Sequence, residues 1–235
     1  MIEDGWTFGE AGSKTADHEN GRRFLHQIYT MADVKYSGRV TVPVLWDRET
    51  NSIVNNESSE ILRMFNSEFD AFGDSALDLY PEPLRREIDE LNDYIYLRIN
   101  NGVYRCGFAT SQEAYEEAYR ALFEGLDEIE DRLDERRYLL GSQITEADWR
   151  LFTTLIRFDP VYVGHFKCNR QRIVDFKNIS AYLRDLYQVP GISETVNMVH
   201  IKTHYYESHR TINPTSVVPF GPEMHLEFPH GRESL

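Results

Sequence analysis

Residues 38–65 read GRVTVPVLWDRETNSIVNNESSEILRMF, and this stretch determines how the rest of the chain is interpreted. The run at 40–46 is mostly β-branched or apolar, which favours a buried strand. Pro43 interrupts that run, and because proline cannot donate to a sheet, it marks a strand start or a special peptide bond. The sequence then predicts a turn at 47–51 and a short second strand at 52–54.

A helix is predicted to follow the second strand. The run at 56–60, NESSE, is typical of a helix start, and apolar residues at helical spacing follow it. Glu57 and Ser58 place a carboxylate beside a hydroxyl at the point where backbone N–H groups have no helical partner. Such a group of donors and acceptors can hold the zwitterionic end of a ligand.

The order VPVL at 42–45, IVNN at 53–56 and ES at 57–58 resembles the glutathione half-site of glutathione S-transferases, which lies in a thioredoxin-like domain. The flanking sequence is similar to that of one class within this superfamily. GWTF, LHQIYTMADVKYSGRVTVPVLWD and IVNNESSEILRMFN resemble the glutathionyl-hydroquinone reductases, the Xi class. The similarity runs through the whole chain.

The resemblance implies roles for three residues of this stretch. Val42 would precede a cis-proline and pair its backbone with the cysteinyl part of glutathione. Glu57 and Ser58 would bind the γ-glutamyl end. Glutathione is then the expected co-substrate.

Two further residues have a packing or charge interpretation beside the one that the resemblance implies. Trp6, in the GWTF motif, is either a packing anchor in a turn or a side chain that packs against glutathione. Arg39 is either a solvated charge at a strand end or a ligand to a glutathione carboxylate.

Composition excludes several other classes of protein. The 235 residues carry a formal charge of -14, and phosphate binding needs clustered Lys and Arg, so nucleic acid and anionic membranes are not expected partners. There is no apolar run of roughly 18 residues and no signal-like start, which favours a cytoplasmic protein. Cys106 and Cys168 are interpreted as free thiols.

The nucleophile of the resembled family, a cysteine in a CPWAHR type of motif, has no counterpart in these 235 residues. A helix start lowers a thiol pKa, and neither Cys106 nor Cys168 lies at a recognisable one, so both are expected to be unreactive structural thiols and no catalytic residue is assigned. We therefore expect either that the chain is shortened relative to its natural gene product, or that a partner chain replaces the missing layer.

The fold class is predicted as α/β plus all-α. Residues 1–68 form a thioredoxin-like glutathione-binding domain, incomplete in this chain, and 69–82, rich in Asp, Ser, Gly and Pro, form a linker. Residues 83–207 form a glutathione-transferase-type helical domain, and 208–235, with four prolines, form a C-terminal extension.

Apolar periodicity predicts the helices of the second domain. Helices are expected from about 84 and from about 111, with Asn101-Gly102 as the stop between them. Two later helices are expected over 179–187 and over 193–206.

The run YLLGSQITEADW at 138–149 predicts another helix start. Thr145 and Asp148 have the spacing of a capping box, in which each side chain bonds the backbone of the other. The run also resembles the folding-nucleus motif of the glutathione transferase helical domain. Both residues are therefore interpreted as structural.

In the resembled family three tyrosines hydrogen-bond the quinol oxygens, and the best-matching positions are Tyr104, Tyr162 and Tyr205. The chain has 14 tyrosines, so core or surface packing is the alternative for each, and Tyr206 competes with Tyr205. His200, four residues before another histidine, has the spacing of a metal pair, but no carboxylate arrangement completes a site and no metal is expected.

Three functions remain open from the sequence. The first is an enzyme that reduces glutathionyl-hydroquinones by thiol exchange once the nucleophile is present. The alternatives are a non-catalytic module that binds glutathione or aromatic ligands, and the same chemistry with another low-molecular-weight thiol. The expected partners are glutathione, quinol-type aromatic molecules and a second copy in a homodimer.

Overall fold

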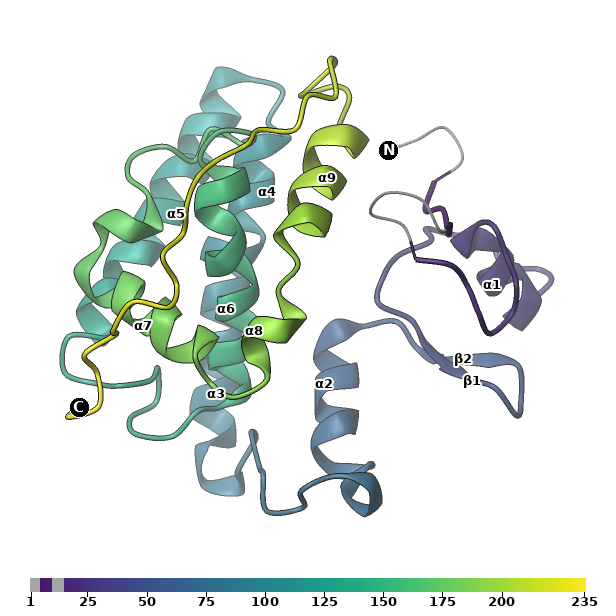
Figure 1. The fold of residues 1–235 in the computed structure, drawn as a ribbon, viewed down its shortest axis with the longest axis horizontal. Coiled ribbons are helices and arrows are strands. Elements are labelled where there is room, and N and C mark those ends of the chain that lie inside the picture. The colour runs from purple at the N-terminus through teal and green to yellow at the C-terminus, as the bar shows by residue number, and fades with distance from the viewer. Residues whose placement is uncertain (1–4, 10–14) are drawn as a thin grey trace. The chain divides into compact units, whose positions relative to one another are not determined.

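The computed structural model describes residues 5–9 and 15–235 (Figure 1). The predicted domain 1–68 therefore lies partly outside the described residues. The predicted domain divisions at 69–82 and 208 stay predictions. The chain forms two compact units: Met1–Asp78 with Tyr206–Val217, and Leu79–Tyr205 with Val218–Leu235.

The first unit contains one small sheet and two helices. β1 and β2 form an antiparallel pair with a shift in register between Leu45 and Trp46, and the hairpin lies beside α1 (Figure 1). The elements are α1 (Leu25–Ala32), β1 (Leu45–Asp47), β2 (Ser52–Asn55) and α2 (Ser58–Ser67).

The predicted strand at 40–46 is wrong in its extent, because only its end enters β1. The partner strand β2 has only four residues, and Pro43 has no N–H to offer a ladder. The strand is also half-buried rather than fully buried. Apolar sequence alone does not produce a strand where no neighbour pairs with it.

A small apolar core holds the hairpin on α1. Leu25, Ile28 and Tyr29 are buried at helical spacing on α1. Val44 and Trp46 pack against these three side chains. The core of this unit therefore lies on one face of α1.

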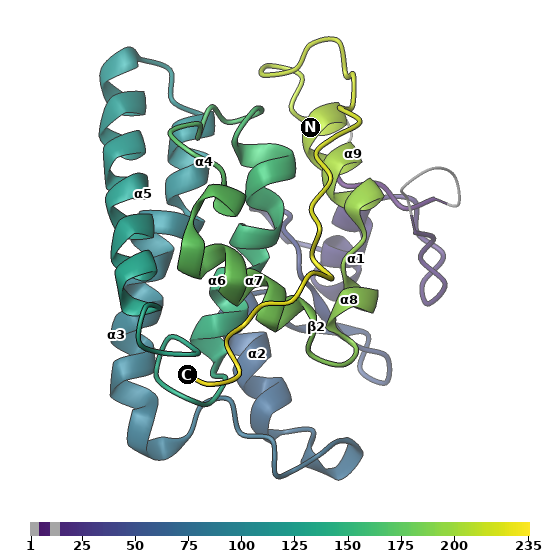
Figure 2. The same ribbon diagram turned by 60° about the vertical axis from the view of Figure 1, so that its left-hand side comes forward.

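The second unit is helical (Figure 2). Aliphatic side chains from several helices, among them Ile88, Leu122 and Leu155, are fully buried in its core. Among the described residues, no helix has the length and apolar character needed to cross a membrane. The helices are α3 (Arg85–Ile95), α4 (Gly102–Gly107), α5 (Gln112–Arg132), α6 (Glu146–Arg157), α7 (Lys177–Tyr187), α8 (Ile192–Thr195) and α9 (Met198–Ser208).

The stop predicted at Asn101-Gly102 is wrong. A π-helical turn over Tyr96–Asn100 follows α3 directly, and α4 begins at Gly102. A Cβ at Gly102 would lie 3.5 Å from a methyl of Leu122, an ordinary van der Waals distance, so the packing of α4 on α5 does not require glycine here. A glycine within a helical pattern does not by itself end the helix.

The single helix predicted over 193–206 is two helices, α8 and α9. The side-chain oxygen of Asn197 accepts from the N–H of His200 at 3.0 Å. Asparagine at this position starts a new helix, because its side chain satisfies an N–H that has no partner in the first turn.

Asp148 is fully buried and fixes the start of α6. Its carboxylate accepts from the N–H and the hydroxyl of Thr145, at 2.8 and 2.9 Å. It also accepts from the N–H of Leu139 at 2.9 Å and from the hydroxyl of Tyr182 at 2.8 Å. Burial raises the pKa of Asp148, and these donors oppose that rise. The predicted reach of Asp148 back to Thr145 is confirmed.

The C-terminal segment runs along the second unit, in yellow in Figures 1 and 2. The side-chain amide of Gln188 donates to the carbonyls of Leu226 and Phe228, each at 2.8 Å. Arg232 is buried, and its guanidinium donates to the carbonyl of Leu133 at 2.9 Å. This arginine satisfies a carbonyl at the end of α5, where the helix leaves acceptors without a partner.

We predict that Asp148→Ala lowers the free energy of unfolding by at least about 3 kcal/mol, because several buried donors lose their acceptor at roughly 1–3 kcal/mol each. Urea unfolding measures the change. The matched control is Glu117→Ala, which removes a carboxylate that is 74% exposed in its ion pair with Arg105. Its cost is expected to stay under about 1 kcal/mol. Equal losses in the two variants would contradict the role of Asp148.

Candidate functional site

Three tyrosine hydroxyls meet in the second unit. The Tyr104 and Tyr205 hydroxyls are 2.5 Å apart, and those of Tyr162 and Tyr205 are 2.8 Å apart. The three residues come from α4, from the π-helical turn after α6 and from α9. The structure thus brings together the three positions that the sequence analysis singled out, although their role stays a prediction. The backbone of Tyr206 instead accepts from Asn213.

Two phenylalanines extend this cluster, and the sequence analysis did not identify them. The Phe166 ring stacks on Tyr162 with centroids 5.5 Å apart, and the Phe108 ring lies parallel to Tyr104 at 6.4 Å. A Cβ at Gly107 would overlap the Phe166 ring, so only glycine fits there. Gly107, directly before Phe108, was the one signal in the sequence for this packing, and it did not indicate that Phe166 is the partner.

The environment keeps the cluster uncharged. Burial raises the pKa of Tyr162 and of Tyr205 well above that of an exposed phenol, and the positive charge of Arg157 opposes the rise only in part. Burial also lowers the pKa of His165, whose ring lies against Phe166, to about 4. At neutral pH these hydroxyls therefore act as neutral donors and acceptors. Phenol or quinol oxygens on a flat ring match both their chemistry and their aromatic surroundings.

In the first unit, the peptide bond between Val42 and Pro43 is cis, as the resemblance implied. The Tyr29 hydroxyl donates to the carbonyl of Thr41 at 2.8 Å. The side-chain amide of Asn56 donates to the Thr41 hydroxyl at 3.1 Å and to the Tyr29 hydroxyl at 3.2 Å. This network connects Thr41, which precedes Val42, and Asn56, which precedes Glu57, to the buried Tyr29.

The N-terminus of α2 lies directly beyond this network. Glu57 is the residue before the helix and Ser58 is its first residue, and both side chains are exposed. Glu57 does not cap the helix with its side chain, and its N–H donates to the side-chain oxygen of Asn55 at 2.7 Å. N–H groups of the first turn can therefore bind a ligand carboxylate, which the helix dipole favours.

Arg39 and Trp6 both have exposed side chains. Arg39 is exposed, its carbonyl accepts from the Tyr36 hydroxyl, and its guanidinium has no ion-pair partner in the described part of the chain. The carbonyl of Trp6 accepts from the N–H of Leu25 at 3.0 Å, and its side chain is 37% exposed. The network around Asn56 links Val42 to the start of α2, but the structure shows no such link for Arg39.

The histidines of α9 and both cysteines also have defined places. Among residues 5–9 and 15–235, no group of three or more His, Cys, Asp or Glu side chains gathers to hold a metal, and this includes the surroundings of His200 and His204. Cys106 and Cys168 are free thiols, and both are buried. Neither sulfur is presented at the surface to a bound substrate.

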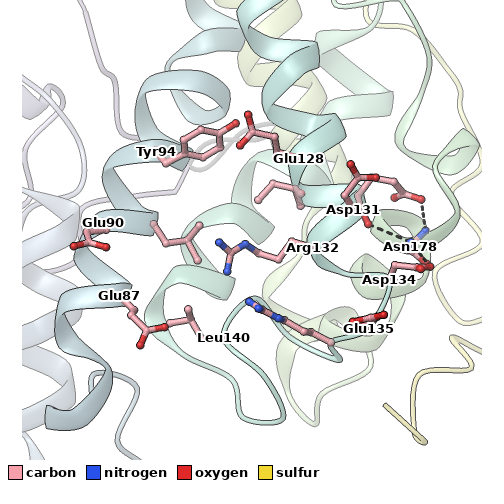
Figure 3. A pocket seen from close by; sticks show the side chains of 14 residues that line it. Glu87, Glu90, Tyr94, Glu128, Asp131, Arg132, Asp134, Glu135, Leu140 and Asn178 are labelled. Carbon is pink, nitrogen blue, oxygen red and sulfur yellow. Dashed lines mark hydrogen bonds between the residues drawn. The ribbon is translucent and has the colours of Figure 1, made fainter.

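A groove of about 1050 Å³ lies elsewhere in the second unit, beside α3 and the end of α5. Figure 3 shows the Arg132 guanidinium among carboxylates that include Glu128 and Asp131. The sequence analysis did not predict this groove. Its excess of negative charge would repel the carboxylates of glutathione, so its size does not make it the glutathione site.

Comparison with known proteins gives the family. Residues 112–185 match the family described as glutathione S-transferase, C-terminal domain. The chain is 57% identical over 234 residues to the glutathionyl-hydroquinone reductase YqjG of Escherichia coli K12, covering 99% of this chain and 71% of that protein. It is 51% identical to the glutathionyl-hydroquinone reductase PcpF of Sphingobium chlorophenolicum, covering 96% of this chain and 72% of that protein.

Solved structures agree. The glutathione-bound structure of Escherichia coli YqjG has a TM-score of 0.97 at 56% identity, covering 100% of this chain and 76% of that one. The Xi class glutathione transferase of Natrialba magadii has a TM-score of 0.97 at 51% identity, covering 100% of this chain and 72% of that one.

This chain belongs to the Xi class of the glutathione S-transferase superfamily. The predicted family and fold class, an incomplete thioredoxin-like domain followed by a glutathione-transferase helical domain, are confirmed. The small sheet of this Xi-class chain is the remaining β-structure of the thioredoxin-like part in the described residues.

We predict that removing the Tyr205 hydroxyl costs more stability than removing that of Tyr104. Tyr205→Phe leaves the buried Tyr162 hydroxyl without this hydrogen bond, at a cost of roughly 1–3 kcal/mol. Tyr104 is 38% exposed, so in Tyr104→Phe water replaces the lost group and the cost stays under about 1 kcal/mol. Urea unfolding of both variants measures the difference, and the reverse order would show that Tyr205 is not the centre of the cluster.

Proposed function

We propose that this chain binds glutathionyl-hydroquinones and serves their reduction by thiol exchange. The observation that carries the proposal is the cluster of neutral tyrosine hydroxyls in an aromatic surrounding. The names of the relatives YqjG and PcpF support it, because both are glutathionyl-hydroquinone reductases. The first unit carries groups suited to glutathione, and the second unit carries groups suited to the hydroquinone ring.

The glutathione half uses the backbone and the start of α2. The γ-glutamyl carboxylate accepts from the N–H and hydroxyl of Ser58, while Glu57 pairs with the γ-glutamyl ammonium. The cysteinyl backbone pairs with that of Val42. Arg39 meets the second carboxylate and Trp6 packs against the peptide. The network of Tyr29 and Asn56 supports these contacts, because it fixes the residues next to Val42 and Glu57.

The hydroquinone half uses Tyr104, Tyr162 and Tyr205. Burial raises the pKa of Tyr162 and of Tyr205 and keeps these two phenols protonated, so both can donate to a ring oxygen. Hydrogen bonds to the ring oxygens stabilise the charge that develops on the ring as the carbon–sulfur bond breaks.

The exchange proceeds in two balanced steps. A thiolate attacks the glutathionyl sulfur, the sulfur–ring bond breaks, and the ring carbon takes a proton, which leaves a hydroquinone and a mixed disulfide. A second glutathione thiolate then attacks the mixed disulfide and releases glutathione disulfide. Cys106 and Cys168 are buried, so neither is assigned as the attacking thiolate.

Burial of both cysteines also favours a second candidate function, a module that binds glutathione or aromatic ligands without turnover. The use of another low-molecular-weight thiol stays open, because Val42 and Ser58 would recognise backbone and carboxylate groups that other peptidic thiols share. A homodimer, a cytoplasmic location and a metal-free site stay predictions.

We predict that Ser58→Ala weakens glutathione binding about 10-fold or more, because a hydrogen bond to a charged group contributes roughly 1.5–3 kcal/mol. Isothermal titration calorimetry measures the dissociation constant. The matched control is Ser67→Ala at the other end of the same helix, where the hydroxyl donates to the carbonyl of Arg63. The control is expected to change nothing, and an equal loss in both variants would exclude the proposed carboxylate contact.

We further predict that the 235-residue chain binds glutathione but releases hydroquinone from a glutathionylated hydroquinone no faster than the uncatalysed reaction. The physical reason is that no exposed thiol is available among its described residues. Chromatographic measurement of released hydroquinone tests this. Robust turnover would contradict it and would require Cys106 or Cys168 to reach the substrate.

A further inference from the structure

A second, smaller pocket of about 230 Å³ lies on the second unit. Its lining residues come from α6, α8 and α9 and from the residue that follows α8. None of Tyr104, Tyr162 and Tyr205 lines it. The proposed function therefore leaves this pocket without a ligand.

The inner wall of the pocket is apolar. Phe152, Ile156 and Ile201 are buried side chains of this wall. The half-buried Trp149 meets the edge of Phe152, with ring centroids 5.7 Å apart. An apolar cavity of about 150 Å³ is enough to hold benzene in another protein. This pocket therefore has room for one substituted aromatic ring.

The hydroxyl groups of the lining are already used by the backbone of their own turns. The Thr153 hydroxyl donates to the carbonyl of Arg150 at 3.0 Å. The Thr195 hydroxyl donates to the carbonyl of Ile192 at 2.7 Å. Neither hydroxyl proton is left for a ligand, so polar recognition in this pocket falls to Arg157, the one charged side chain of its lining.

Arg157 is the last residue of α6, and its side chain is half-buried. One nitrogen of its guanidinium donates to the carbonyl of Thr153 at 2.6 Å. In the described part of the chain, no carboxylate pairs with it. Other arginines of this acidic chain are paired, as Arg120 is with Glu116. Since a guanidinium carries five N–H donors, Arg157 can still bind an anion.

We propose that this pocket binds an aromatic carboxylate that has a single ring. The ring lies against Trp149 and Phe152, and the carboxylate accepts two parallel hydrogen bonds from the guanidinium of Arg157, whose planar fork matches it. A phosphate dianion fits less well, because one cation beside apolar walls does not compensate two charges that leave water. The inference goes beyond the proposed function, since it involves neither glutathione nor a hydroquinone.

The pocket lies close to the tyrosine cluster along the chain but uses different residues. Ile201 and Tyr205 are four residues apart on α9, which places them on the same face about one turn from each other. Arg157 directly precedes the π-helical turn that carries Tyr162. The experiment must therefore separate binding in the pocket from binding at the tyrosines.

The test titrates the 235-residue chain with 4-iodobenzoate, without glutathione or hydroquinone. Calorimetry is expected to give a dissociation constant of about 1 mM or lower. Iodine quenches a tryptophan that it contacts, and Trp149 is the one tryptophan of the second unit, so we expect saturable quenching in the wild type and none in Trp149→Phe. Saturating glutathione or hydroquinone is expected to leave the titration unchanged.

Two comparisons test the role of the charge. On the wild type, the neutral 4-iodobenzyl alcohol is expected to bind at least about 10-fold more weakly than the carboxylate, because it cannot form the ionic hydrogen bonds. Arg157→Gln is expected to weaken 4-iodobenzoate by a similar factor, and Arg157→Lys by less. The matched control is Arg120→Gln, which removes the same charge from a side chain that is 68% exposed and is expected to change nothing. Circular dichroism confirms that each variant is folded.

Four results would overturn the proposal. The absence of saturable binding would exclude the site. Equal affinity for the alcohol and the carboxylate, or an equal effect of Arg157→Gln and Arg120→Gln, would show that Arg157 does not bind the anion. Quenching that persists in Trp149→Phe would place the ligand in the first unit. Displacement by glutathione or hydroquinone would assign the ligand to the glutathione contacts or the tyrosine cluster instead.

Discussion

The buried carboxylate of Asp148 is the interaction on which the helical unit depends. It binds the first residue before α6, the segment at Leu139 and the hydroxyl of Tyr182 on α7, so three separate parts of the chain share one acceptor. A buried carboxylate is tolerated only where donors compensate the lost water. Its position sets the start of α6, and the far end of α6 leads into the turn that carries Tyr162. The site is therefore placed by a contact that takes no part in binding.

This contact was predictable because it is local. Thr145 and Asp148 are three residues apart, and the spacing alone indicates a helix start. The strand predicted at 40–46 failed because a ladder needs a partner strand, which sequence periodicity cannot supply. The stop predicted at Asn101-Gly102 failed because the chain continues through a π-helical turn into α4, which packs on the distant helix α5. What is decided within one turn of chain was accessible from sequence, and what is decided by a distant neighbour was not.

The same division holds for the site. The resemblance, rather than any spacing, selected Tyr104, Tyr162 and Tyr205 from the 14 tyrosines, and the structure brings their hydroxyls together. The aromatic contact of Phe166 was not predictable, because the glycine that admits it lies in a separate helix. The side chains of Arg39 and Trp6 are exposed in the described chain, and the roles that the resemblance implies for them stay predictions.

Burial acts in the same direction on the phenols and the thiols of this part of the unit. It raises the pKa of Tyr162 and keeps a phenol neutral, and at Cys106 it opposes the lowering of the thiol pKa that the neighbouring Cys168 causes. Phe166 touches both, because its ring stacks on Tyr162 and its carbonyl faces the thiol of Cys168. Gly107 leaves that ring no room to move towards α4. One tightly packed residue therefore joins the packing of the phenols to that of the buried Cys168.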